Sequence, residues 1–209
     1  MDIILASASP RRKGLLSLLY DSFRVIPSDI RELVPRDLPV DKCPEYLACI
    51  KAESISRGRE KYLVIGCDTS VIIDGKMLNK PRSTDDARLM MKMLSGKVHR
   101  VITGCCLYYL GRHVSFSEET EVEFYPLTDK EIEEYVNTSE PYDKAGGYGI
   151  QNKGALFIKG IRGDYYNVVG LPVARLKREI DAFTAQDFTV DEFVTEARNK
   201  NEGKKRRRT

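Results

Sequence analysis

Hydrophobic positions along the chain alternate between unbroken apolar runs, typical of buried strands, and the three- and four-residue spacing of amphipathic helices. Ser9 suits a helix N-cap and Pro10 the first helical position. Asp74–Gly75 has the composition of a tight hairpin turn. The first half is therefore predicted to contain a strand at Ile3–Ala6, a helix from Pro10 to about Leu19, a strand at Phe23–Ile26, a helix from Glu45 to about Gly58 and a strand through Leu63–Ile73.

The second half continues with longer strands and further helix signals. Thr128 followed three residues later by Glu131 is a capping box, which predicts a helix start. The elements expected here are a helix capped near Ser83 or Thr84 and stopped at Gly96, strands at His99–Leu110 and Val114–Tyr125 with a turn at Gly111, a helix after Thr128, a strand at Ala155–Ile161, a helix at Pro172–Phe183 and one more after Thr189. Because hairpins interrupt the alternation of strand and helix, we expect a single α/β domain with a mixed sheet flanked by helices.

The C-terminal end differs in composition from the rest of the chain. Residues 204–208 are all Lys or Arg, and they account for much of the formal net charge of +3. We therefore expect one domain over residues 1–198 and a disordered basic tail over residues 199–209, which either solubilises the chain or serves as a nuclear localisation signal. Without the tail the body is near neutral, so global charge does not favour a nucleic-acid-binding domain.

Targeting and cysteine chemistry also narrow the classes. No apolar run approaches the roughly 20 residues needed to cross a bilayer, and the N-terminus lacks a secretory pattern, which predicts a cytoplasmic protein without a membrane partner. The cysteines number five and include no C-x-x-C pair, so we expect reduced thiols. Neither histidine has a zinc-ligand spacing to a cysteine.

The first candidate site lies where the first strand meets the first helix. Ser7, Ser9, Arg11 and Arg12 follow the strand, at the edge where open α/β sheets bind ligands. A helix N-terminus favours anions, and arginine forks and serine hydroxyls match phosphate oxygens. The alternative is an ordinary N-cap with two solvated arginines. The physical arguments support phosphate binding and this alternative about equally.

The second candidate is Asp68, which interrupts the apolar run Leu63–Ile73. A buried carboxylate costs several kcal/mol unless it is paired, hydrogen-bonded or bound to a cation. The functional interpretation is a general base or metal ligand, and the structural one is an aspartate that caps a turn at a strand end. Four further polar residues, Glu32, Lys51, Lys80 and Gln151, are not selected by periodicity, and singly each has the character of a solvated surface residue.

Five short segments together closely resemble the Maf (septum-formation) family and occur in its order. They are Leu5–Arg12, Gly66–Thr69, Lys80–Arg82, Asp143–Gln151 and Val169–Pro172. The resemblance covers about Ile3 to Ile180. It implies a fold similar to inosine triphosphate pyrophosphatases, with an elongated mixed sheet and a central cleft, and a homodimer. It also implies hydrolysis of a nucleoside triphosphate substrate to the monophosphate and pyrophosphate with a divalent cation, Mg²⁺ or Mn²⁺.

The resemblance also assigns roles to the candidate residues. Asp68 would be the proton acceptor and, with Glu32, would lie near the metal. The phosphate and metal shell would consist of Ser7, Arg12, Glu32, Lys51 and Lys80. Base specificity would be set by Arg11, Thr69 and Gln151. Asn79 stands where the family often has an acid, which leaves the metal shell open.

The branch of the family follows from two of these positions. Members similar to 7-methyl-GTP pyrophosphatases tend to carry tryptophan and glutamine where this chain has Arg11 and Thr69, and this chain contains no tryptophan. The resemblance therefore points to the dTTP/UTP pyrophosphatase branch. Two alternatives stay open: a pyrophosphatase that removes modified or non-canonical nucleotides, and a non-catalytic division regulator that binds nucleic acid through its tail.

Overall fold

The computed structural model describes residues 1–185 and divides the chain into two compact units, Met1–Val173 and Ala174–Thr209. The predicted helix at Pro172–Phe183 is confirmed and occupies residues 173–185. The helix expected after Thr189 and the boundary between domain and tail lie outside the described residues. No helix among residues 1–185 is long and apolar enough to span a membrane.

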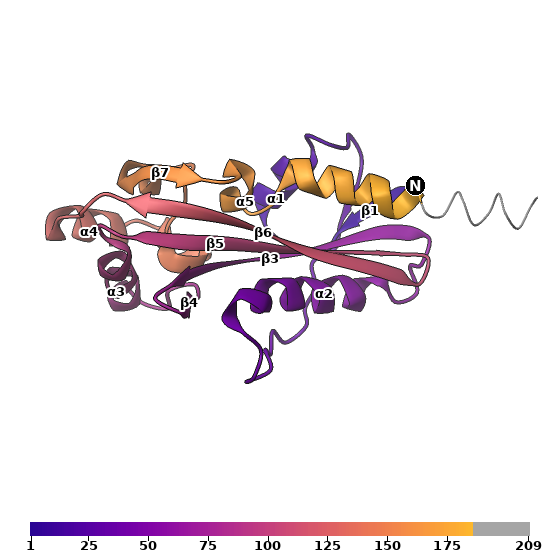
Figure 1. The fold of residues 1–209 in the computed structure, drawn as a ribbon, viewed down its shortest axis with the longest axis horizontal. Helices are drawn as coiled ribbons and strands as arrows, with labels where there is room; N and C mark the ends of the chain where they lie inside the picture. Colours follow the sequence, from indigo (N-terminus) through magenta and orange to yellow (C-terminus); the bar gives the residue numbers. More distant parts are fainter. Residues whose placement is uncertain (186–209) are drawn as a thin grey trace, which may run out of the picture. The chain divides into compact units, whose positions relative to one another are not determined.

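The first unit is built on one mixed sheet of seven strands (Figure 1). Its order is β2-β1-β3-β5-β6-β7, with the short β4 paired to β3. Strand β1 runs parallel to β2 and β3, and the remaining pairs are antiparallel, which confirms the predicted mixed sheet. The strands are β1 (Asp2–Leu5), β2 (Arg24–Val25), β3 (Tyr62–Ile73), β4 (Lys76–Leu78), β5 (Val98–Tyr109), β6 (Arg112–Phe124) and β7 (Ile158–Arg162).

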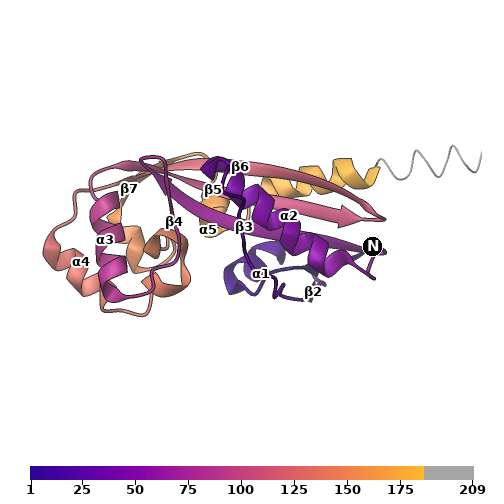
Figure 2. The same cartoon turned by 90° about the horizontal axis from the view of Figure 1, so that it is seen from below.

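Helices cover both faces of the long strands. The helices are α1 (Pro10–Leu16), α2 (Cys43–Ser56), α3 (Thr84–Leu94), α4 (Asp129–Val136) and α5 (Tyr165–Val169), with short 3₁₀ helices η1 (Val40–Lys42), η2 (Pro141–Asp143), η3 (Ala145–Gly147) and η4 (Lys153–Phe157). Helix α2 packs on β3 and β5 from one side, and α5 packs on β5 and β6 from the other (Figure 1). Helices α3 and α4 pack together at one end of the long strands (Figure 2).

Helix α2 approaches the sheet unusually closely because two strand positions are glycine. A Cβ atom at Gly66 would lie 2.2 Å from the backbone oxygen of Ala48 and 2.8 Å from the Cβ of Ala52. A Cβ atom at Gly104 would lie 2.3 Å from the backbone nitrogen of Glu45. Any larger side chain would overpack these contacts and push the helix away. The small residues therefore hold α2, and the side chains on it, directly against β3.

Local signals located most helix ends and hairpins. Ser9, Ser83 and Thr128 are N-caps whose side chains accept backbone N–H groups, and the capping box with Glu131 is complete. The hairpin turn at Asp74–Gly75 is confirmed, with φ of 49° and 72°. These outcomes follow from chemistry within four residues of each position.

The predicted strand at Ala155–Ile161 is wrong in its first half. Ala155–Phe157 belongs to the 3₁₀ helix η4, and β7 begins only at Ile158. The Phe157 ring is buried and lies edge-on to Tyr135 with centroids 4.9 Å apart. The backbone N–H groups of residues 153 and 154 donate to the Glu140 carboxylate, each at 3.0 Å. The Glu140 carboxylate thus binds the backbone at the start of η4, and the buried Phe157 ring anchors its end, so the chain stays in a 3₁₀ helix until Ile158.

Two smaller differences concern helix bounds, and one helix was not predicted. Helix α1 ends at Leu16 rather than near Leu19, and α2 begins at Cys43, two residues before the predicted Glu45. Helix α5 was not predicted, because its five residues are too few to show a helical period.

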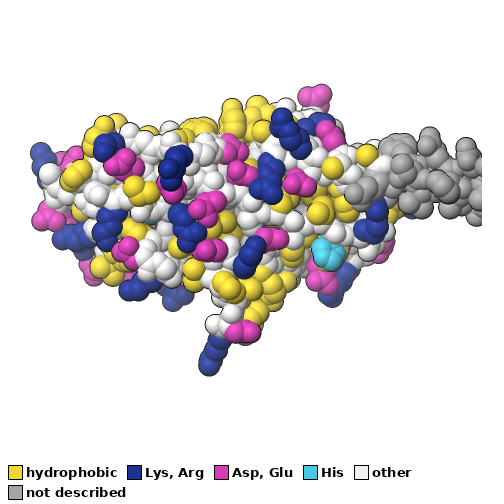
Figure 3. All heavy atoms as spheres, viewed as in Figure 1, with side chains coloured by type: hydrophobic (Ala, Val, Ile, Leu, Met, Phe, Trp, Pro, Cys, Tyr) yellow, Lys and Arg dark blue, Asp and Glu magenta, His cyan; other side chains and the backbone are white. Residues whose placement is uncertain are grey.

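The cysteines and the surface charge agree with the sequence analysis. All five cysteines are free thiols. Cys67 and Cys105 face each other across β3 and β5, with their sulfur atoms 3.8 Å apart. On the face shown in Figure 3, basic and acidic side chains are interspersed rather than separated by sign.

Candidate active site

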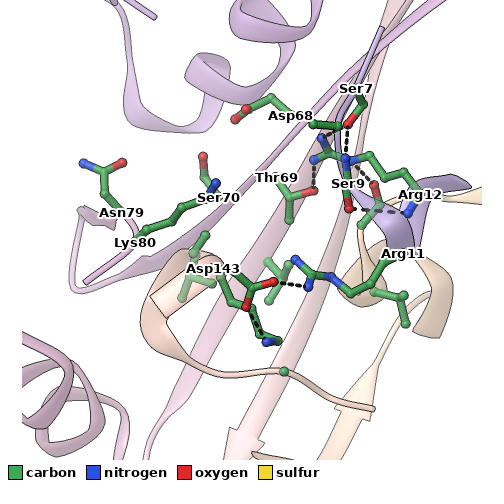
Figure 4. Close-up of a pocket in the computed structure, with 18 of the residues that line it drawn as sticks. Ser7, Ser9, Arg11, Arg12, Asp68, Thr69, Ser70, Asn79, Lys80 and Asp143 are labelled. Atoms are coloured by element: carbon green, nitrogen blue, oxygen red, sulfur yellow. Dashed lines mark hydrogen bonds and ion pairs between the residues drawn. The ribbon is translucent and has the colours of Figure 1, made fainter. Parts of the chain in front are cut away.

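A cavity of about 690 Å³ opens in the first unit beside the carboxyl end of β1 and the middle of β3. Its size is within the range of small-molecule sites. The cavity brings together all ten residues singled out from the sequence: Ser7, Ser9, Arg11, Arg12, Glu32, Lys51, Asp68, Thr69, Lys80 and Gln151. Figure 4 shows Asn79 and Lys80 across the cavity from Ser9 and Arg12. The fold therefore collects residues that the sequence separates by more than a hundred positions.

One side of the cavity carries a lysine between two carboxylates. The Lys51 Nζ atom lies 2.6 Å from Oδ1 of Asp68 and 2.9 Å from Oε1 of Glu32. The Lys51 and Asp68 side chains are only 12% and 13% exposed, whereas that of Glu32 is 53% exposed. Burial raises the pKa of Asp68 above its usual value, although the positive charges of Lys51 and Arg12 oppose the rise. Asp68 is thus a buried carboxylate with an increased affinity for a proton.

The acidic residues on this side suit a metal that binds together with a phosphate. Among residues 1–185, no group of three or more His, Cys, Asp or Glu side chains is placed to hold a metal ion alone. Mg²⁺ is commonly held by one or two carboxylates, with substrate phosphates and waters completing its shell. Glu32 and Asp68 supply such a pair, and the amide of Asn79 lines the same cavity. The donor set fits a cation shared with a ligand and does not fit an all-protein cage.

The turn from β1 into α1 is fixed by its serines. The Ser9 hydroxyl accepts the backbone N–H of Arg12 at 3.4 Å, and the Ser9 backbone N–H donates to the Ser7 hydroxyl at 3.3 Å. The N-cap predicted for Ser9 is confirmed. Both hydroxyls therefore have a role in shaping the turn, beside the ligand contacts predicted for them.

Arg12 uses most of its hydrogen-bonding capacity on the protein itself. Its Nε donates to the carbonyl of Gly170 at 2.9 Å, and its Nη1 donates to the Ser7 hydroxyl at 3.2 Å and to the carbonyl of Cys67 at 2.9 Å. Its Nη2 donates to Oγ1 of Thr69 at 2.9 Å. A guanidinium has five N–H donors, so one on Nη2 is left for a ligand. The forked phosphate contact predicted for Arg12 would require one of these internal bonds to break.

Arg11 takes part in an ion pair across the cavity. Its Nη1 lies 2.7 Å from Oδ2 of Asp143, and the other carboxylate oxygen accepts from Lys144 Nζ at 2.5 Å (Figure 4). Partial burial alone would raise the pKa of Asp143, but the hydrogen bonds from Lys144 and Arg11 outweigh it and lower that pKa. Asp143 and Lys144 belong to a segment that resembles the family, but no role was predicted for either residue.

The glycine-rich loop borders the cavity on another side. Gly146 adopts a φ of 69° and its N–H donates to the carbonyl of Asn79 at 3.1 Å, which ties this loop to the one that carries Lys80. The hydroxyl of Tyr148 lies 2.7 Å from Nε2 of His99 beneath the loop. These contacts hold the segment that leads to Gln151.

Two residues near the site were missed by the sequence analysis. Thr103 on β5 and Asn167 on α5 are completely buried and contact the Thr69 side of the cavity through hydrogen bonds. The available signal was the position of Asn167 between two tyrosines and two valines, because buried polar groups need partners. Their partners lie on other elements and leave no pattern in the sequence.

Comparison with known proteins places this geometry in a family. The family model described as "Maf-like protein" matches residues 2–183. A dTTP/UTP pyrophosphatase from Bacillus pumilus is 47% identical over 186 residues, covering 89% of this chain and 98% of its own. Another from Carboxydothermus hydrogenoformans is 49% identical, covering 86% and 97%. The structure of the Staphylococcus aureus Ham1 protein aligns at 13% identity with a TM-score of 0.46, over 59% of this chain and 72% of that one. Since the family model spans nearly all of the described residues, the chain belongs to the Maf-like protein family.

Proposed function

We propose that this chain is a nucleoside triphosphate pyrophosphatase that hydrolyses dTTP and UTP to the monophosphate and pyrophosphate. The observation that carries the proposal is the buried Asp68, held by Lys51 in a cavity that also contains the other predicted phosphate-binding residues. The substrate is inferred from relatives of 47% and 49% identity, each named a dTTP/UTP pyrophosphatase.

The charge of the cavity suits a polyphosphate. Six basic side chains line it, namely Arg11, Arg12, Lys51, Lys80, Arg82 and Lys144. Only three acidic side chains do so, namely Glu32, Asp68 and Asp143. The excess of positive charge would attract a triphosphate and stabilise negative charge that develops on its leaving group.

The chemistry assigned to Asp68 is that of a general base. Its carboxylate accepts a proton from a water molecule, while the water oxygen forms a bond to the α-phosphorus. The bond between the α- and β-phosphates breaks, and its electron pair leaves with pyrophosphate. A raised pKa makes Asp68 a better proton acceptor than an exposed aspartate.

The cations around Asp68 have two tasks in this scheme. Lys51 and Lys80 hold phosphate oxygens and oppose the charge on the departing pyrophosphate. Glu32 and Asp68 would hold a divalent cation, Mg²⁺ or Mn²⁺, which when bound supplies further positive charge to the phosphate oxygens. We also propose a homodimer, which light scattering of the purified protein would test.

Pyrophosphate release from a panel of triphosphates tests the proposal. The panel comprises dTTP, UTP, CTP, GTP, ATP and 7-methyl-GTP, each with Mg²⁺, Mn²⁺ or a chelator. We expect metal-dependent release of pyrophosphate and the nucleoside monophosphate, fastest with dTTP or UTP. Release of inorganic phosphate and a diphosphate would contradict the bond assigned. Preference for a modified nucleotide would support the alternative of a pyrophosphatase for damaged nucleotides, and no release at all would remove the enzymatic proposal.

A further inference from the structure

A second polar network lies behind the cavity and contains no charged group except Arg12. It joins Asn167 on α5, Thr103 on β5 and Thr69 on β3, and Thr69 in turn contacts Arg12 on α1. Asn167 and Thr103 are 0% exposed. Thr103 and Thr69 are directly opposite each other on the two antiparallel strands. The loss of one partner from such a buried network is strongly destabilising, because each buried polar group left without a hydrogen bond costs free energy.

The orientation of the Asn167 side chain is determined by partners that can act in only one way. Its Oδ1 accepts the backbone N–H of Thr103 at 3.1 Å, and a backbone N–H can only donate. Its Nδ2 donates to the carbonyl of Val101 at 3.0 Å, and a carbonyl can only accept. Nδ2 also donates to Oγ1 of Thr120 at 2.9 Å. The reversed amide would lose the first two bonds, so Asn167 is held in one orientation.

The same reasoning determines the direction of the next two bonds. The Thr103 hydroxyl lies 3.0 Å from the backbone carbonyl of Asn167 and must donate its single proton there. Its contact of 2.9 Å with the Thr69 hydroxyl must then be one in which Thr69 donates. The proton of Thr69 therefore points at Thr103 and away from any ligand.

The hydroxyl oxygen of Thr69 can still accept one hydrogen bond. A hydroxyl oxygen has two lone pairs, and one accepts the Nη2 N–H of Arg12 at 2.9 Å. The residue is half-buried and lines the cavity. The remaining lone pair can accept a hydrogen bond from a ligand but cannot donate one. Phosphate oxygens, which are acceptors, are poor partners for it, and an N–H group is a good one.

We propose that Asn167 and Thr103 are positioning residues that fix Thr69 as a hydrogen-bond acceptor for the ring N3–H of uracil and thymine. This inference rests on the proposed function. Both bases carry a donor at that ring position, whereas cytosine has a bare acceptor nitrogen there. An acceptor facing an acceptor leaves both unsatisfied, which a buried site disfavours strongly. Asn167 and Thr103 would thus favour uracil and thymine over cytosine through Thr69, without themselves touching the nucleotide.

The test compares kcat/KM for UTP and CTP in the wild type and in four variants, a valine and a serine substitution at each of the two threonines. Thr103→Val removes the acceptor for the Thr69 proton, which is then free to be donated to the cytosine nitrogen. We expect the UTP:CTP ratio to fall by about tenfold. Thr103→Ser keeps the hydroxyl and should keep the ratio within about twofold of wild type. Thr69→Val removes the acceptor itself and should lower the ratio as Thr103→Val does, and Thr69→Ser should retain it.

The matched control is Thr120→Val. Thr120 is also 0% exposed and also bonds Asn167, and no hydrogen bond links it to Thr69. Its loss should lower thermal stability and leave the UTP:CTP ratio within about twofold of wild type. If Thr103→Val does not fold, the pair Thr69→Val and Thr69→Ser decides the question.

Three results would overturn the inference. They are a wild-type enzyme that prefers CTP, an unchanged ratio in both valine variants, and an equal loss with UTP and CTP, which would indicate a contact with the sugar or a purely structural role. A wild type that releases no pyrophosphate from any nucleotide would instead refute the proposed function. The two failures are therefore distinguishable.

Discussion

Asp68 and Thr69 are neighbours on β3, yet their side chains lie in very different surroundings. Asp68 faces α2, where its carboxylate shares the amino group of Lys51 with the half-exposed Glu32. Thr69 faces α1 and α5, where its hydroxyl joins a chain of neutral groups that ends in the fully buried Asn167. Alternate residues of a strand point to opposite faces, so one strand supplies both surroundings.

The difference between the Asp68 side and the Thr69 side indicates a separate role for each. On the Asp68 side, ion pairs converge on a single amino group, and an incoming phosphate or cation can replace either partner. On the Thr69 side, hydrogen-bonding partners fix the direction of each bond back to Asn167, which leaves no freedom to rearrange. We infer that the charged side performs the chemistry and that the neutral side holds the shape of the site.

The largest effect on stability is expected when the charged side loses its cation. Lys51→Met leaves the buried Asp68 without its closest partner, which should lower the free energy of unfolding by about 3 kcal/mol. Denaturant unfolding in the presence of a chelator measures this without a metal taking the place of the lysine. Turnover should also fall, because the phosphate-holding cation is gone.

Two further variants sharpen this test. Lys51→Met combined with Asp68→Asn removes both charges and should recover most of the lost stability without recovering turnover. Lys92 forms an ion pair with Asp129 at 3.0 Å, but the two side chains are 51% and 85% exposed. Lys92→Met should therefore cost no more than about 0.5 kcal/mol. A double variant as unstable as Lys51→Met alone would show that the cost does not arise from an unpaired carboxylate.

A somewhat smaller effect on stability is expected when the pH is lowered, through the buried His99 beneath the glycine-rich loop. Burial lowers the pKa of His99 to about 4, from 6.5 for an unperturbed histidine, and its Nδ1 atom has no hydrogen-bond partner. Because the unfolded chain binds this proton more readily, the contribution to stability is complete above the unfolded pKa and is lost as the pH falls towards the folded one. The loss amounts to at most about 3 kcal/mol between pH 6.5 and pH 4.

Unfolding free energies of the wild type and of His99→Gln across that pH range measure the contribution. Carboxylates also titrate in this pH range. The quantity of interest is therefore the difference between the two proteins in the slope of unfolding free energy against pH. A variant with the same slope as the wild type would mean that His99 is not held neutral in the folded state.

The sequence predicted those features whose causes are local. The N-cap at Ser9 and the hairpin at Asp74–Gly75 depend on residues a few positions away, and both were predicted correctly. Asp68 attracted attention because a carboxylate in an apolar strand needs a partner. The candidate residues without such a signal, Lys51 among them, were found only through the family resemblance, and the structure brings them into the same cavity.

The features that were missed have causes that lie far along the chain. Thr103 and Asn167 matter because they form hydrogen bonds to each other and, through Thr103, to Thr69. No spacing along the sequence reveals these contacts. The start of β7 was misplaced because Glu140 takes the backbone donors of η4, again from a distant position. Hydrogen bonds between separate elements are the information that periodicity lacks.

The most direct test of the account is pyrophosphate release from UTP by Asp68→Asn beside the wild type, with equal amounts of folded protein. The substitution keeps the size of the side chain and removes the proton acceptor. We expect turnover to fall by about a thousandfold or more in a protein that still folds, because Lys51 keeps its ion pair with Glu32. Turnover near the wild-type rate in a folded Asp68→Asn protein would contradict the assignment of the chemistry to the charged side of β3.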